Sequence, residues 1–150
     1  MFGLRACGGF LVVMVLTTAP VAAQQAVPAG HIKIATGAAY IVRQNTSLPA
    51  KPGDPVFATD TLRTQTNGAI GVTLADVTRV SLGPDSEMRL ERYVFAPADG
   101  AMGMVLNFVR GVAAYVSGHM AKLAPDSVRL ETPAAIVGVR GTTVAIKVGS

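Results

Sequence analysis

The chain has 150 residues, half of them hydrophobic, and a formal net charge of +4. This length predicts one domain with a single core. The lysines and arginines are scattered singly, which excludes the clustered basic patch of a nucleic-acid-binding protein.

Residues 1–23 have the pattern of an export signal. Arg5 gives a positive start, Phe10 to Ala19 is apolar, and Val21-Ala22-Ala23 supplies small residues for cleavage. The apolar run is too short and too near the start for a comfortable membrane span. We expect cleavage after residue 23, a leader over 24–30, and a periplasmic or secreted protein. On this hypothesis the chain meets the membrane only through the signal; an uncleaved anchor is the alternative.

The remainder predicts short β-strands, because apolar and polar side chains alternate between clusters of turn residues. Residues 68–82 have the best hairpin pattern, with a turn at Ala75-Asp76. Strands are expected over 31–36, 38–43, 56–58, 62–65, 70–74, 78–82, 87–91, 102–108, 112–116 and 128–131, with loops over 44–54 and 117–126.

Two groups of side chains in these strands are expected to have structural roles. Glu87, Arg89 and Glu91 alternate with apolar residues and are expected on a solvated face. Met102 and Met104 are expected to fill the core rather than bind a soft metal, because no cysteine or histidine flanks them.

The last part of the chain carries a continuous apolar stretch. Residues 134–139 have no polar side chain, which predicts a strand buried on both faces. Residues 144–148 alternate as a half-buried strand does. Arg140, Gly141 and Thr142 lie between them, and we expect Arg140 to be held by an acceptor rather than to be catalytic.

A possible duplication links two parts of the chain. Residues 58–70 align with 124–136 at an offset of 66, with six of thirteen positions identical. The hypothesis is two related β units, 31–96 and 102–150, packed about a pseudo-two-fold axis. Chance similarity between β-rich segments is the alternative.

Each aligned segment has an aspartate three residues before an arginine. The pairs are Asp60 with Arg63, and Asp126 with Arg129. We expect each aspartate, in a turn, to pair with its arginine, on a strand, across a corner.

Few residues suggest catalysis. The only cysteine, Cys7, lies in the expected signal, and His31 and His119 lack metal-ligand spacing. No nucleophile-elbow or phosphate-cradling motif occurs. We therefore expect no enzymatic activity, no metal and no cofactor; a hydrolase assembled from distant residues is the alternative.

A family resemblance rests on ordered motifs. Thr132-Pro133, an apolar run and then Val139-Arg140-Gly141-Thr142 resemble the signature of the FecR-like domain family of bacterial envelope proteins. Residues 59–64 and Pro84-Asp85-Ser86 match as well. The resemblance implies an all-β domain; the strand pattern alone favours a sandwich or a solenoid-like stack. Signalling members of the family couple an outer-membrane receptor to a sigma factor.

The main hypothesis is an exported, non-enzymatic domain that binds an envelope protein, with a role in regulation or signalling. The alternative is a cell-wall or polysaccharide-binding module that presents Tyr40, Tyr115 and Arg140 to a glycan. The C-terminal unit is also expected to lack one strand, so that another copy or another protein pairs with the edge over 142–148. Candidate structural or binding residues are Asp60, Arg63, Asp126, Arg129, Arg140, Gly141 and Thr142.

Overall fold

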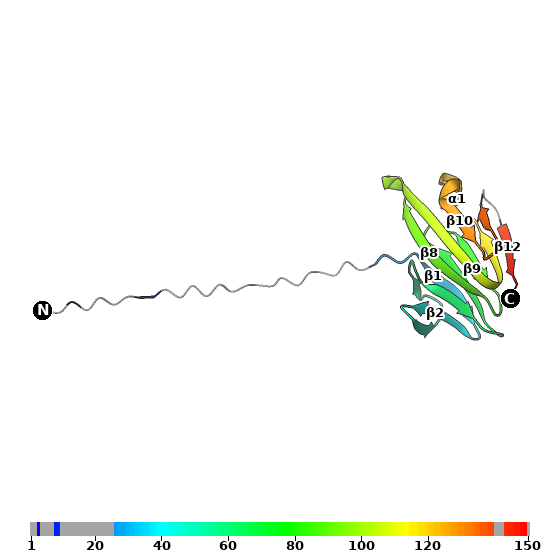
Figure 1. Cartoon of the computed structure of the whole chain (residues 1–150), viewed down its shortest axis with the longest axis horizontal. Helices are drawn as coiled ribbons and strands as arrows, with labels where there is room; N and C mark the ends of the chain where they lie inside the picture. Colours follow the sequence, from blue (N-terminus) through cyan, green and yellow to red (C-terminus); the bar gives the residue numbers. More distant parts are fainter. Residues whose placement is uncertain (1–2, 4–7, 10–25, 140–142, 150) are drawn as a thin grey trace.

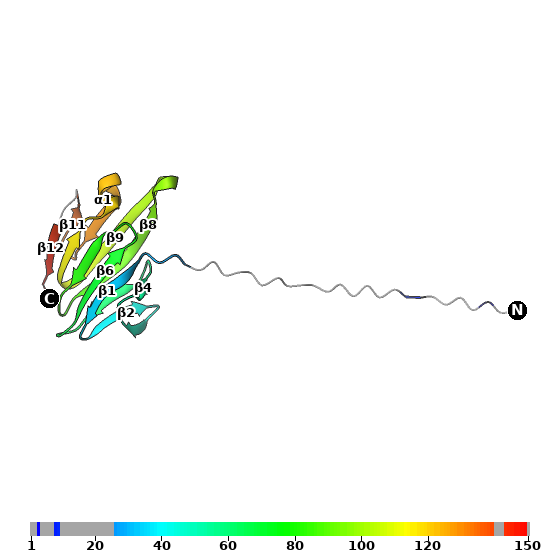
Figure 2. The same ribbon diagram turned by 180° about the vertical axis from the view of Figure 1, so that it is seen from behind.

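The computed structural model describes residues 3, 8–9, 26–139 and 143–149. Most of the expected export signal, and Arg140, Gly141 and Thr142, lie outside these residues. The described chain is mostly β, as expected, and its strands form one curled, half-barrel sheet (Figures 1 and 2). No helix in the described part is long and apolar enough to cross a bilayer.

The described residues form twelve strands and three short helical segments. The strands are β1 (Gly30–Thr36), β2 (Ala39–Arg43), β3 (Thr46–Pro49), β4 (Pro55–Val56), β5 (Thr61–Thr64), β6 (Ala69–Leu74), β7 (Arg79–Leu82), β8 (Glu87–Ala96), β9 (Ala101–Val116), β10 (Val128–Glu131), β11 (Ile136–Gly138) and β12 (Thr143–Val148). The helical segments are η1 (Pro97–Asp99), α1 (His119–Leu123) and η2 (Pro125–Ser127).

The central strand of the sheet is β9, which has sixteen residues. Its first half pairs with β8 on one side and, in parallel, with β10 on the other. Its second half pairs with β7 and β12, both antiparallel. The path β3-β2-β5-β8 therefore meets β9 at one end, and the path β4-β1-β6-β7 meets it at the other.

The change of partners along β9 falls between Arg110, which pairs with Glu87, and Gly111, which pairs with Val148. Gly111 has φ +88°, and a Cβ there would collide with the Ser86 hydroxyl and the Asp85 carbonyl. Only glycine satisfies both conditions easily. The glycine thus lets the two backbones approach closely where the sheet changes direction.

Buried hydroxyls hold this corner together. The Val112 N–H donates to Ser86 Oγ at 2.9 Å, and the Ser86 N–H donates to Thr64 Oγ1 at 2.9 Å. The Thr64 hydroxyl in turn donates to the Gly83 carbonyl at 2.6 Å. Ser86 and Thr64 are both fully buried, so these bonds give their polar atoms partners away from water. They join β5, the turn before β8, and the corner of β9.

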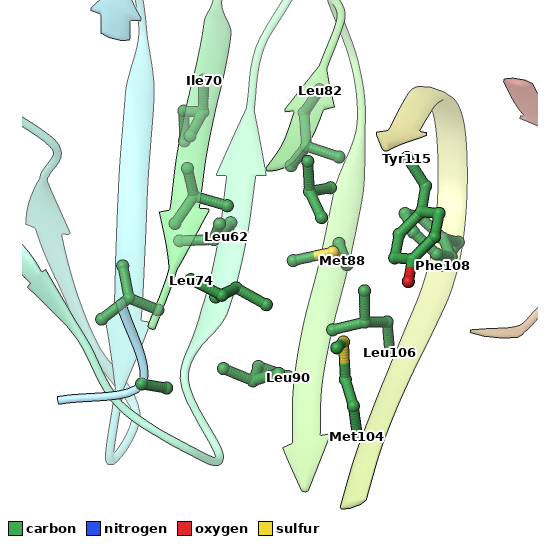
Figure 3. Close-up of a cluster of buried hydrophobic side chains, with 14 of the residues drawn as sticks. Leu62, Ile70, Leu74, Leu82, Met88, Leu90, Met104, Leu106, Phe108 and Tyr115 are labelled. Carbon is green, nitrogen blue, oxygen red and sulfur yellow. The ribbon is translucent and has the colours of Figure 1, made fainter. Parts of the chain in front are cut away.

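The core is one cluster on the inner side of the curl, contributed by strands of both halves (Figure 3). The large side chains in it are buried because alternate strand residues point inward. Met88 and Met104 belong to it, which confirms the core-filling role expected of Met104. Other members are Leu62, Ile70, Leu74, Leu82, Leu90, Leu106, Phe108 and Tyr115.

Several strand boundaries differ from the predicted ones. The loop expected over 44–54 contains β3, and the two strands expected over 102–108 and 112–116 are one continuous strand. The loop expected over 117–126 contains α1 and part of η2, which are too short to produce a helical periodicity.

The prediction for residues 134–139 was wrong over most of its length. Ile136 is 68% exposed and Val137 is 36% exposed; only Val139 is buried. In the described structure β11 pairs with β10 alone, and the exposure of all three of its residues shows that no second layer covers it. The alternation over 144–148 is confirmed, because Val144, Ile146 and Val148 pack against the core.

The expected duplication is not visible in the strand pairing. β5 is antiparallel to β2 and β8, whereas the aligned β10 is parallel to β9. The division into two related units stays a prediction.

The corner at Gly111 generates the first testable prediction. Replacement of Gly111 by alanine should lower the free energy of unfolding by roughly 2–5 kcal/mol, because strain at positive φ adds to the steric conflict with Ser86. Gly53→Ala is the matched control: Gly53 has φ +92° but open space around it. It should lose only roughly 1–2 kcal/mol. Urea denaturation measures both, and equal losses would contradict the close contact inferred at Gly111.

Candidate functional site

Asp60 lies in the turn before β5 and is 1% exposed. Arg43 of β2 donates from Nε to Oδ1 at 2.9 Å and from Nη2 to Oδ2 at 2.7 Å. The Phe57 N–H donates to Oδ2 at 2.9 Å, and the Arg43 guanidinium lies 4.7 Å from the Phe57 ring centroid. A two-pronged, charge-assisted pair of this kind fixes geometry, so Asp60 anchors the turn to β2.

The expected pair of Asp60 with Arg63 was therefore wrong. Side chains an odd number of residues apart on extended backbone point to opposite faces, so Arg63 turns outward while Asp60 is buried. Arg63 instead faces Glu87 of β8, with Nε 3.4 Å from Oε2. Arg110 of β9 approaches the same oxygen at 3.6 Å. These three side chains form a partly exposed ion-pair cluster.

The second expected pair is also not formed as a salt bridge. Arg129 lies on β10 and approaches Glu131, two residues away on the same face, at 3.7 Å. Asp126 lies in η2 and is exposed. Asp126 and Arg129 nevertheless line one hollow of about 280 Å³, beside Ile136 and Gly138 of β11. The structure thus brings these two candidates together at the sheet margin.

A buried carboxylate that sequence reasoning missed lies in the turn between β6 and β7. Asp76 is fully buried and accepts hydrogen bonds from the Thr78 hydroxyl at 2.7 Å, the Tyr93 hydroxyl at 2.8 Å and the Met120 N–H at 3.1 Å. It links this turn to β8 and α1. The nearby threonine is visible in the sequence, but Tyr93 and Met120 are too distant in the chain to be predicted.

Tyr115 is wholly buried, so the glycan-binding surface expected from Tyr40, Tyr115 and Arg140 is not formed by that tyrosine. Its position follows from β9, where it pairs with Val80 and Val144 on the core side. Tyr40 is half-buried on β2, and Arg140 lies outside the described residues.

Main-chain groups that are free to pair with another strand lie at the margins of the sheet. In the described structure β3, β4, β11 and β12 each pair with a single strand. β11 and β12 lie at the same margin, where the chain ends (Figures 1 and 2). An edge strand presents unpaired N–H and C=O groups that can bind another strand. This margin also contains the hollow beside Asp126 and Arg129. It is the candidate binding site.

Comparison with known proteins decides the family. The family model described as FecR protein matches residues 60–150, which is more than half of the chain. The chain belongs to the FecR family. This is a regulatory or signalling family that is not known for enzymatic members. Searches of the curated proteins and of the solved structures gave no match.

The family match begins near β5, yet the strands before it complete the fold. β1 and β2 precede the matched region, but β1 pairs with β6 and β2 pairs with β5, and both of these partner strands lie inside it. The matched region includes the corner formed by Ser86 and Gly111 and the margin formed by β11 and β12. Among the residues that the structure describes, no three metal-ligating side chains converge.

The buried ion pair yields a second prediction. Asp60→Asn should lower the free energy of unfolding by roughly 2–3 kcal/mol, because Arg43 loses a bidentate charged acceptor. Glu87→Gln is the control; it weakens a partly exposed cluster and should cost less than about 1 kcal/mol. Urea denaturation of both variants makes the comparison. A loss for Glu87→Gln as large as that for Asp60→Asn would contradict the distinction.

The pKa values of two tyrosines predict that the folded state loses stability at alkaline pH. Burial, and then the hydrogen bond to Asp76, raises the pKa of Tyr93; burial raises the pKa of Tyr115. A raised folded-state pKa means that the folded chain holds its proton where the unfolded chain has lost it. The stabilisation is complete below the unfolded value of about 10 and declines as pH rises above it.

Tyr93→Phe should be less stable than wild type at neutral pH, because Asp76 loses a hydrogen-bond donor. Its stability should fall less steeply with pH above about pH 10, because the variant lacks this ionisable hydroxyl. Denaturation curves collected across this pH range give the slope. An unchanged slope in Tyr93→Phe would show that this hydroxyl is not protected from ionisation in the folded state.

Proposed function

We propose that the mature chain is an exported, non-enzymatic regulatory domain that binds an envelope protein through the C-terminal margin of its sheet. The observation that carries the proposal is the open edge of β12 in a member of a regulatory family. β12 pairs with β9 alone in the described structure, and its outward side chains Thr143, Ala145 and Lys147 are exposed.

Strand addition suits this geometry. A partner strand that extends the sheet gains main-chain hydrogen bonds along β12, and its side chains then alternate between the two faces. β12 is itself held firmly, because Val144, Ile146 and Val148 pack against the core. The receiving edge is therefore ordered before the partner arrives, which reduces the entropy lost on binding. Lys147 discourages indiscriminate pairing at this edge.

Export is the second part of the proposal. The support is the sequence of residues 1–23, with its positive start, apolar run and small residues before the cleavage position. A domain released in this way would meet outer-membrane and periplasmic proteins directly.

The test combines location with partner class. Intact mass of the protein recovered from the periplasm should correspond to a chain that begins at Gln24. A photo-crosslinking residue placed at Ala145 should capture an envelope protein, whereas the same residue at Ser47 of the opposite edge strand β3 should not. Purified peptidoglycan should not bind the domain, whether the photo-crosslinking residue is at position 145 or at position 47. Retention of Met1 would refute export, and binding to peptidoglycan without protein capture would favour the glycan-binding alternative.

A further inference from the structure

A hollow of about 410 Å³ lies where the turn between β6 and β7, the end of β9 and α1 meet. Three basic side chains line it: Arg79 at the start of β7, and His119 and Lys122 on α1. All three residues are exposed. No acidic side chain is among the described residues that line the hollow. The fold therefore gathers in one concavity basic groups that lie far apart in the sequence.

The positive charge of this hollow is not neutralised by neighbouring carboxylates. No salt bridge within the described part of the chain involves Arg79 or Lys122, whereas salt bridges do occupy four other arginines, which are Arg43, Arg63, Arg110 and Arg129. The strands β1, β6, β7, β9 and β12 contain no aspartate or glutamate at all. A concave surface lined by charges of one sign concentrates ions of the opposite sign. The hollow is therefore suited to an anion.

The one carboxylate beside the hollow, that of Asp76, is buried and already has its partners. The Thr78 and Tyr93 hydroxyls donate to it at 2.7 and 2.8 Å. The Met120 N–H donates to the same carboxylate at 3.1 Å, and the His119 N–H donates to the Asp76 carbonyl at 2.8 Å. These bonds fasten α1 to the turn that leads into β7. The two walls that carry the basic side chains are thus held together before a ligand arrives, which reduces the entropy lost on binding.

Aliphatic side chains accompany the basic ones. Val77 lines the hollow and is 51% exposed, and Leu123, which follows Lys122 at the end of α1, is 60% exposed. Residues three and four positions apart share one face of a helix, so Leu123 and Lys122 lie on the same face as His119. Val77 has φ +62°, a conformation that is strained for a β-branched residue and less costly for glycine or asparagine. Backbone strain of this kind is concentrated at binding sites.

We propose that this hollow binds a phosphate group, with Arg79 and Lys122 pairing with its charge and the His119 imidazole donating a hydrogen bond. A phosphate presents three acceptor oxygens to donors that approach from different elements, whereas a carboxylate presents two oxygens in one plane. The planar fork of an arginine and the point charge of a lysine are both common phosphate ligands.

The phosphate belongs either to a lipid headgroup or to a soluble phosphate ester. A lipid surface would also bury exposed aliphatic side chains that lie beside cations, as Val77 and Leu123 do. The experiment distinguishes the two sources. The inference goes beyond the proposed function and does not depend on strand addition at β12, so either can fail without the other.

The experiment compares Arg79→Gln and Lys122→Gln with Arg89→Gln. Arg89 is an exposed arginine on β8 that forms no salt bridge in the described chain, so the control removes the same charge at another place. Unchanged thermal unfolding confirms that the variants fold. One probe is a vesicle of phosphatidylcholine and phosphatidylglycerol in equal parts, with pure phosphatidylcholine as the blank, measured by co-sedimentation. The other is inorganic phosphate, followed by the NMR signals of the His119 imidazole, with acetate and a short polyglutamate peptide as carboxylate probes.

Wild type and Arg89→Gln should bind the mixed vesicles and not the pure ones, and inorganic phosphate should shift the His119 signals in both. Arg79→Gln and Lys122→Gln should each bind about tenfold more weakly or less, because each loses one charge-assisted hydrogen bond. Vesicle binding that requires Arg79 and Lys122 assigns the site to a lipid headgroup. A phosphate shift that requires them, without vesicle binding, assigns it to a soluble phosphate ester.

Three results would overturn the proposal. Neither phosphate nor the mixed vesicles might bind wild type. Arg89→Gln could weaken binding as much as Arg79→Gln does, which would show that only the net charge matters. Finally, acetate or the polyglutamate peptide could bind as well as phosphate does, which would assign the hollow to the carboxylates of an acidic protein instead.

Discussion

The fold depends on the close contact between the backbone at Gly111 and the buried hydroxyl of Ser86. A sixteen-residue strand that pairs on both sides along its length would ordinarily continue one twisted layer. Here the glycine permits a positive φ, and Ser86 bonds to the next N–H, so β9 changes partners within one residue. Every strand of the core is connected to β9 through the continuous pairing of the sheet. The corner therefore determines how the strands enclose their apolar side chains.

Buried carboxylates serve the same structural purpose in two turns. Asp60 holds the turn before β5 through Arg43, and Asp76 holds the turn before β7 through neutral donors. Neither carboxylate is available to a substrate, because both are almost completely buried. These two carboxylates thus stabilise turns.

Alternation predicted much of the sheet because its physical basis is local. Val72, Val80 and Leu82 lie inward as their spacing requires. The same reasoning failed at Ile136, because an uninterrupted apolar run has the same appearance whether or not a second layer covers it. It failed for Asp60 because Arg43, its true partner, lies on another strand seventeen positions earlier. An edge strand near the C-terminus was predictable from the sequence, whereas the exposure of β11 is determined by the fold.

The parallel pairing of β10 with β9 has a consequence for the order in which the domain assembles. A parallel neighbour cannot form through a tight hairpin, so the chain must first travel back along the sheet through α1 and η2. The connecting segment is held to the sheet by Met120, which is buried in the core and whose N–H donates to Asp76. This contact spans 44 positions in the sequence. Contacts of such large sequence separation form slowly, and they depend on a hairpin that already exists. Formation of β10, and of β11 which pairs with it, therefore depends on the β6–β7 turn that carries Asp76, so this margin is assembled on a sheet that is already in place.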